Sequence, residues 1–247
     1  MIKIAMFRPE SKNIEYKIED VEVINIPVTK TVDTNIDILN FLKSIGPVEY
    51  LIFTSTLAAQ KFRRSIGDQF DLYLNQAKEV IAIGTETAKA IRSKATVVPP
   101  VQSTAGIAEH LKSKSGTVLL VRSRQGNPTL IKELGSHMSV YVLDIYSSQQ
   151  LLPDQRHIEF SKELINKHVD ALIFTSSMIT TSFYNIFSVL DSKLVEHLTE
   201  VLKIAIGKET ENTMTSLNLV PDHTLSKPEI LKAIKIVKEI CSKRGRQ

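Results

Sequence analysis

The sequence has a single cysteine, Cys241, and no tryptophan among its 247 residues. One cysteine excludes an intramolecular disulfide and any zinc or iron–sulfur site built from several cysteines, and it fits a reducing compartment. No apolar run approaches the roughly 18 residues that a membrane-spanning helix needs. The opening MIKIAMFRPE lacks the apolar region and cleavage site of a secretory signal. We therefore expect a cytoplasmic protein that does not span a membrane.

The sequence also has only a small excess of positive charge and lacks the common catalytic motifs. There are 31 lysines and arginines against 27 aspartates and glutamates, a net charge of +4, which is too weak a field to indicate nucleic acid. The six histidines are scattered without metal-ligand spacing. No GxSxG, GxGxxG or GxxxxGK[ST] motif occurs, which disfavours a serine hydrolase and a nucleotide-binding protein.

An internal repeat is the most informative feature present. LIFTSTLAAQKF at Leu51–Phe62 returns as LIFTSSMITTSF at Leu172–Phe183, and IAIGTETA at Ile81–Ala88 returns as IAIGKETE at Ile204–Glu211. A weaker echo pairs the opening KIAMFRPE with LLVRSRQG at Leu119–Gly126. The two clear offsets, 121 and 123 residues, predict a gene duplication into two similar halves.

Short apolar runs alternate with helical patterns in both halves. Their nearly continuous apolar character is typical of parallel strands covered on both faces. The pattern predicts two flavodoxin-like α/β domains, each with a doubly wound parallel sheet. The predicted strands are Ile2–Phe7, Val21–Ile26, Tyr50–Phe53, Val80–Ile83, Val118–Val121, Val140–Ile145, Ala171–Phe174 and Ile204–Ile206.

The repeated motifs fall where such sheets bind ligands, beyond the carboxyl ends of the strands. Each motif is a strand, then a hydroxyl or glycine turn, then a helix start that exposes backbone N–H donors. Four such turns suit a ligand with several carboxylates or phosphates. The same residue types also serve as ordinary helix caps, and both interpretations stay open. The candidate substrate-binding residues are Ser55, Thr56, Gly84, Thr87, Ser176, Ser177, Gly207 and Thr210.

Taken in order, these segments resemble the uroporphyrinogen-III synthase family over essentially the whole chain. Besides the repeated turns, the resemblance rests on Arg8-Pro9 after the first strand, on Val118–Arg122 and on a strand that ends in Tyr146. The resemblance implies two domains joined by two extended linkers. One domain would hold residues 1–30 plus 152–247 and the other residues 34–146, with linkers at 28–33 and 147–153.

The resemblance also implies a reaction. Hydroxymethylbilane would be cyclised to uroporphyrinogen III, with loss of water and inversion of ring D, in a cleft between the domains and without a metal or organic cofactor. Tyr146 matches the tyrosine usually proposed to assist loss of the hydroxyl, although from the residues alone it favours a packing role. The implied enzyme is a lyase of tetrapyrrole and heme biosynthesis. We expect a monomer that binds neither nucleic acid nor membrane and contacts hydroxymethylbilane synthase transiently.

The sequence departs from the family pattern at two places, and other functions stay open. Residues 122–127 read Arg-Ser-Arg-Gln-Gly-Asn, so no role is assigned to Arg124 or Asn127, and the shifted Lys203 also receives none. The first alternative is a non-catalytic two-domain protein that binds a polycarboxylate or another anionic small molecule. The second is a nucleic-acid or regulatory module that uses the basic C-terminal tail.

Overall fold

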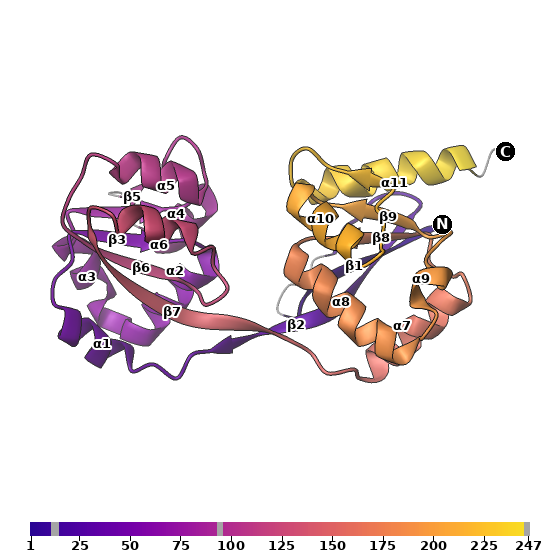
Figure 1. The fold of residues 1–247 in the computed structure, drawn as a ribbon, viewed down its shortest axis with the longest axis horizontal. Helices are drawn as coiled ribbons and strands as arrows, with labels where there is room; N and C mark the ends of the chain where they lie inside the picture. Colours follow the sequence, from indigo (N-terminus) through magenta and orange to yellow (C-terminus); the bar gives the residue numbers. More distant parts are fainter. Residues whose placement is uncertain (11–14, 93–95, 245–247) are drawn as a thin grey trace. The chain divides into compact units, whose positions relative to one another are not determined.

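The computed structural model describes residues 1–10, 15–92 and 96–244 of the chain. It divides the chain into two compact units (Figure 1). Unit 1 consists of Met1–Thr31 and Gln149–Gln247, and unit 2 consists of Val32–Ser148. Each unit is an α/β structure built on a parallel sheet. Within the described residues, no helix is both long and apolar enough to cross a membrane.

The sheet of unit 1 has the strand order β10-β9-β8-β1-β2. Its helices cover both faces, because alternate residues of each strand point to opposite sides. The strands are β1 (Ile2–Pro9), β2 (Val21–Asp33), β8 (Ala171–Phe174), β9 (Leu202–Ala205) and β10 (His223–Thr224). The helices are α7 (Gln155–Ile165), α8 (Ser177–Leu190), α9 (Leu194–His197), α10 (Lys208–Ser216) and α11 (Ile230–Arg244).

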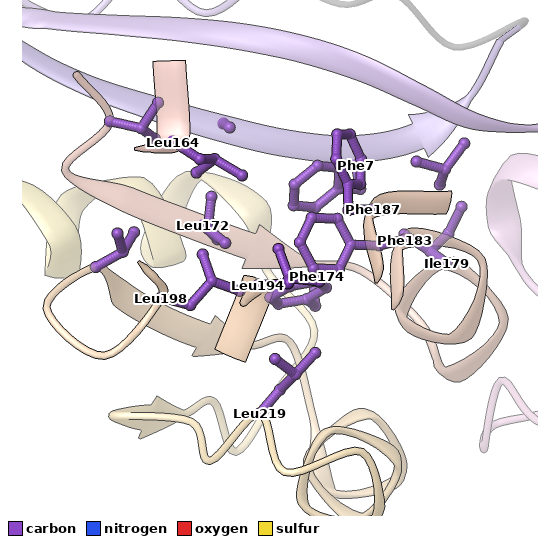
Figure 2. Close-up of a cluster of buried hydrophobic side chains, with 14 of the residues drawn as sticks. Phe7, Leu164, Leu172, Phe174, Ile179, Phe183, Phe187, Leu194, Leu198 and Leu219 are labelled. Atoms are coloured by element: carbon purple, nitrogen blue, oxygen red, sulfur yellow. The ribbon is translucent and has the colours of Figure 1, made fainter. Parts of the chain in front are cut away.

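One face of this sheet carries a phenylalanine-rich core. Phe7 of β1 lies 4.4 Å from Phe183 of α8 and 5.2 Å from Phe174 of β8, measured between ring centroids (Figure 2). The alternate residues of β1, such as Met6, point to the other face of the sheet and belong to the core that includes α11. The two apolar faces of β1 therefore explain why its sequence is an unbroken apolar run.

The sheet of unit 2 has the strand order β7-β6-β3-β4-β5. Its strands are β3 (Tyr50–Phe53), β4 (Glu79–Ala82), β5 (Thr96–Val97), β6 (Thr117–Ser123) and β7 (Ser139–Gln150). Its helices are α1 (Ile38–Ile45), α2 (Thr56–Ile66), α3 (Phe70–Gln76), α4 (Thr85–Ile91), α5 (Thr104–Leu111) and α6 (Thr129–Leu134), with a 3-10 turn at Gly67–Gln69. The eight predicted strands match elements of the two sheets, with bounds that differ by up to two residues, except that β2 and β7 extend seven and five residues further than predicted. The strands β5 and β10 were not predicted, because two residues show no periodicity.

The two sheets have the same order once their strands are matched by the internal repeat, which makes β6, β7, β3, β4 and β5 equivalent to β1, β2, β8, β9 and β10. Each combines two strands from one half of the sequence with three from the other: β1 and β2 join β8–β10, while β6 and β7 join β3–β5. The first domain is therefore discontinuous in sequence. The predicted duplication is compatible with this arrangement, in which the same strand order occurs twice.

Strand register corrects one detail of the repeat. Ala171 of β8 and Tyr50 of β3 are equivalent, because each directly precedes a LIFTS segment. Ile4 pairs with Ala171, and Val118 pairs with Tyr50, so Ile4 and Val118 are also equivalent. The echo of KIAMFRPE in LLVRSRQG was therefore aligned two residues too far along. A shift of two preserves the inward and outward faces of a strand, so an apolar pattern alone does not detect it. In the corrected alignment Arg8 is equivalent to Arg122.

Candidate functional site

The strand order in each unit reverses direction at one point, and open α/β sheets bind ligands beyond the carboxyl ends of the strands at such points. In unit 1 the reversal lies between β1 and β8, and in unit 2 between β6 and β3. The turns that begin at Ser55 and Ser176 follow β3 and β8 directly. The predicted hydroxyl residues thus lie at the expected edge of each sheet.

In unit 2 this edge brings Ser55 and Tyr146 together, 91 residues apart in the sequence. Ser55 Oγ accepts a hydrogen bond from the backbone N–H of Ala58, 3.0 Å away, which caps α2. The same oxygen lies 3.1 Å from the hydroxyl of Tyr146, and either hydroxyl can donate. Tyr146 is 9% exposed, so the pair is held at the border of the core. The two hydroxyls and the Ala58 N–H therefore form one hydrogen-bonded group.

A β-bulge explains why Tyr146 reaches Ser55. Arg122 of β6 pairs with Asp144 of β7, but the next residue, Ser123, pairs with Tyr146 and leaves Ile145 unpaired. In a regular strand, Ile145 and Tyr146 would point to opposite faces. With the bulge, both belong to the core cluster that includes α2. The bulge therefore turns the phenol toward the helix that Ser55 caps.

Each polar residue of the repeated LIFTS segment has a structural contact. In unit 1, Thr175 Oγ1 donates to the carbonyl of Phe7 at 3.1 Å and ties β8 to β1. Ser176 Oγ accepts from the N–H of Ile179 at 3.3 Å, and Ser177 Oγ donates to the carbonyl of Glu209 at 3.1 Å. The five-residue identity is thus explained by packing, bridging and capping, without a ligand. A ligand-binding role for Ser176 and Ser177 stays a prediction.

The two glycine turns differ in what surrounds them. Gly84 and Gly207 are both extended residues that precede α4 and α10, and neither has a side chain to cap the helix. In unit 2, Gln102 Oε1 accepts from the N–H of Thr85 at 3.2 Å, and it lies 2.6 Å from where a Cβ on Gly84 would be. Around the equivalent point at Gly207, no described atom lies within 4 Å. The turn before α10 is open, whereas Gln102 occupies the turn before α4.

The remaining predicted residues lie on the same helices or on α2. Thr87 and Thr210 are equivalent third residues of α4 and α10, and they are only 4% and 3% exposed. Their burial favours a packing role, so substrate contact through these side chains stays a prediction. Thr56, the first residue of α2, lines a surface groove together with Arg63 and Arg64.

Sequence reasoning missed two buried arginines at the same edge, Arg8 and Arg122, which are 4% and 8% exposed. Arg122 Nε lies 2.9 Å from Asp144 Oδ1, and its Nη1 donates to the carbonyls of Gly126 and Asn127. Arg8 follows the apolar part of β1 and Arg122 follows that of the equivalent strand β6, so a repeat aligned by strand register would have identified them as a pair. The backbone N–H of Arg124 donates to the carbonyl of Tyr146 at 2.8 Å.

The other buried or shifted charges lie away from these turns. Lys203 is 7% exposed, lies 3.2 Å from Asp222 Oδ2 and donates to the carbonyls of Leu198 and Val201, so its charge is compensated without a ligand. A hydrogen bond from Arg156 lowers the pKa of Asp154 to about 2. In the part of the chain that the structure describes, no group of three or more histidine, cysteine, aspartate or glutamate side chains could hold a metal ion.

Comparison with known proteins adds a family to this geometry. The family model described as uroporphyrinogen-III synthase HemD matches residues 15–235. Uroporphyrinogen-III synthetase from Helicobacter pylori has a similar structure, with TM-score 0.65 and 17% identity over 97% of this chain and 100% of that one. A mutant synthase from the extremely thermophilic bacterium Thermus thermophilus has TM-score 0.61 and 16% identity over 97% and 99%. No curated protein matches.

Proposed function

The chain belongs to the uroporphyrinogen-III synthase family, and from this premise we propose that it cyclises hydroxymethylbilane to uroporphyrinogen III with loss of water and inversion of ring D. The reaction is that of a carbon–oxygen lyase in porphyrin and heme biosynthesis. The hydroxyl of the substrate must leave, and the resulting azafulvenium cation must be attacked by the substituted carbon of ring D. The protein therefore has to supply a proton donor, hold the carboxylates and keep the substrate curled.

The Ser55–Tyr146 contact is the observation that carries this proposal. Ser55 Oγ already accepts the Ala58 N–H, so its own proton is free to be donated to the phenol oxygen. The phenol then keeps its proton for the departing hydroxyl of the substrate. The chain of donors begins at the positive end of α2, and each bond polarises the next, which makes the phenol a better acid. Tyr146 acts as the acid, and Ser55 orients it.

The carboxylates of the substrate require donors rather than a dense cluster of cations. The turns at the starts of α2 and α4 in unit 2, and of α8 and α10 in unit 1, offer backbone N–H groups and hydroxyls. The turn before α10 is open around Gly207, so we propose it as the first of these to take a carboxylate. Holding several carboxylates at once fixes the curl of the bilane, so that the substituted carbon of ring D is the near one.

A coupled assay tests the function. Porphobilinogen and a hydroxymethylbilane synthase supply the substrate, and after oxidation the ratio of uroporphyrin III to uroporphyrin I is measured by chromatography. Spontaneous closure gives isomer I, so isomer III in proportion to the added protein is the expected result, and heat-denatured protein is the control. Isomer I alone with bound bilane would favour the alternative, a non-catalytic protein that binds a polycarboxylate. Isomer I alone without binding would leave only the fold in common with the family.

We further propose that the protein works in the cytoplasm as a monomer and takes its substrate from hydroxymethylbilane synthase by transient contact. Sedimentation velocity at assay concentration tests the monomer. A concentration-dependent increase in sedimentation coefficient on addition of hydroxymethylbilane synthase is the expected sign of the contact, and its absence at micromolar concentrations would contradict that part of the proposal.

A further inference from the structure

Arg8, near the carboxyl end of β1, is a buried cation with neutral partners. Its Nε donates to Met6 Sδ at 2.9 Å, its Nη2 donates to the hydroxyl of Tyr16 at 2.6 Å, and its guanidinium carbon lies 5.4 Å from the centre of the Tyr16 ring. Every aspartate and glutamate of the chain is among the described residues. None of their carboxylate oxygens lies within 4.0 Å of an Arg8 nitrogen, the distance that defines an ion pair. Among the described residues, this guanidinium, whose residue is 4% exposed, thus has no counterion.

Arg122, the equivalent of Arg8 in unit 2, has a carboxylate partner that Arg8 lacks among the described residues. Arg122 is paired with Asp144, which is directly opposite it on the neighbouring strand. Opposite Arg8 stands Pro27, which carries no charge. A buried charge costs free energy unless an opposite charge and hydrogen bonds compensate it. In unit 2 the side chain of Asp144 compensates the charge of Arg122, whereas the residue opposite Arg8 in unit 1 has no carboxylate.

Arg8 also lies where a ligand is expected. It follows Phe7, whose carbonyl accepts the hydroxyl of Thr175, so it stands beside the turn after β8 at the reversal point of the sheet. A guanidinium offers parallel N–H donors that match a carboxylate.

We infer that Arg8 binds a carboxylate of the substrate, an inference that rests on the proposed function for the identity of that substrate. The carboxylate takes the place that the phenol of Tyr16 holds at Nη2 in the free protein. It supplies from outside the negative charge that Asp144 supplies to Arg122. Arg8 thus costs stability in the free protein and gains its counterion only on binding.

One variant, Arg8→Met, distinguishes a role of Arg8 in ligand binding from a role in stability. Methionine has nearly the length of arginine and no charge, so Arg8→Met removes the unpaired cation from a site that already contains Met6. We expect its melting temperature to rise by about 2–4 °C, because a buried uncompensated charge is removed. We expect binding of uroporphyrin I, a stable octacarboxylate followed by its absorbance, to weaken about 10- to 100-fold. A residue that serves only packing would not combine a gain in stability with a loss of binding.

Two further variants serve as controls. Arg122→Met leaves the Asp144 carboxylate without its cation, so we expect its melting temperature to fall. Arg8→Lys keeps the charge but not the paired donors, so we expect part of the affinity to return relative to Arg8→Met. A lower melting temperature for Arg8→Met, or uroporphyrin binding equal to that of the wild-type protein, would overturn the inference.

The binding measurement also distinguishes this inference from the proposed function. If the wild-type protein makes no isomer III but uroporphyrin I binds in an Arg8-dependent manner, the site stands and the synthase activity fails. If isomer III is made at the wild-type KM by Arg8→Met, the activity stands and the site fails. Inorganic phosphate, tested at equal ionic strength, shows whether Arg8 takes any oxyanion: Arg8-dependent binding of phosphate as strong as that of uroporphyrin would overturn a site for carboxylates.

Discussion

The two units have the same order of repeat-equivalent strands and the same LIFTS segment, yet they differ at the carboxyl ends of their strands. Unit 2 has Tyr146 where unit 1 has Thr29, because these residues follow the bulges in the equivalent strands β7 and β2. Unit 1 has an open turn at Gly207 and, in the part of the chain that the structure describes, no counterion for Arg8, whereas Gln102 covers the equivalent turn of unit 2. Similar folds therefore carry different chemistry: the proposed proton donor belongs to unit 2, whereas the open turn and the arginine proposed to bind a carboxylate belong to unit 1.

The largest effect is expected from removing the proton donor. Tyr146→Phe keeps the aromatic packing but loses the hydroxyl, so kcat should fall about 100-fold without reaching zero, because positioning of the substrate survives. Isomer III formation in the coupled assay measures this. Tyr141→Phe makes the same chemical change on the same strand and should leave kcat unchanged. An unaltered kcat for Tyr146→Phe would contradict the role of Tyr146 as proton donor, and with it the proposed chemical difference between the units.

A double-mutant cycle tests whether Ser55 acts through Tyr146. Ser55→Ala and Ser176→Ala each lose an N-cap, so both should lower the free energy of unfolding by about 1 kcal/mol. Only Ser55→Ala should also lower kcat, about tenfold, and its effect should largely vanish in the Tyr146→Phe background, a coupling of about 1 kcal/mol.

Ser176→Ala provides the matched cycle in the other unit. It should raise KM rather than lower kcat, and its effects should add to those of Tyr146→Phe. Additive effects in both cycles would contradict a positioning role for Ser55, and Ser55→Thr, which keeps the hydroxyl, should restore most of the kcat.

The glycine turns give a smaller effect that differs between the units. A Cβ on residue 84 would lie 2.6 Å from Gln102 Oε1, so Gly84→Ala should displace Gln102 and lower the free energy of unfolding by about 1 kcal/mol. Gly207→Ala meets no neighbour and has an extended backbone, so its stability should stay the same while KM rises. Thermal unfolding and KM are measured for both. An unchanged KM in Gly207→Ala would argue against a carboxylate at the open turn.

The smallest expected effect concerns acid stability. The Arg156 guanidinium lowers the pKa of Asp154 from 3.8 to about 2, so the folded state favours the carboxylate. This stabilisation is complete above about pH 4 and is lost as the pH falls toward about 2. Asp154→Asn should therefore lower stability at neutral pH by about 0.5 kcal/mol or less, since the group is partly exposed, and the difference should close by about pH 2. Asp37→Asn, at the N-cap of α1, controls for exchanging a capping carboxylate for an amide. A difference of constant size over the whole range would contradict the assignment.

Much of the fold could be predicted because its signals are local. The run at Leu51–Phe53 is apolar on both faces, which only a covered parallel strand tolerates, and Ser55 begins a helix because its oxygen caps the N–H of Ala58. The turn residues could be placed at the sheet edge for the same reason. Their partners could not be predicted, because a hydrogen bond over 91 residues leaves no periodic trace in the sequence.

The sequence by itself determined the strands, the helix starts and the repeated turns, since each depends on contacts within a few residues. Only the tertiary structure decided that a bulge at Ile145 aims Tyr146 toward Ser55, and that Arg122 faces Asp144 while Arg8 faces Pro27. These features depend on register between strands, and register is set by the packing of whole sheets rather than by neighbours in the chain. The chemical difference between the two units arises at that level.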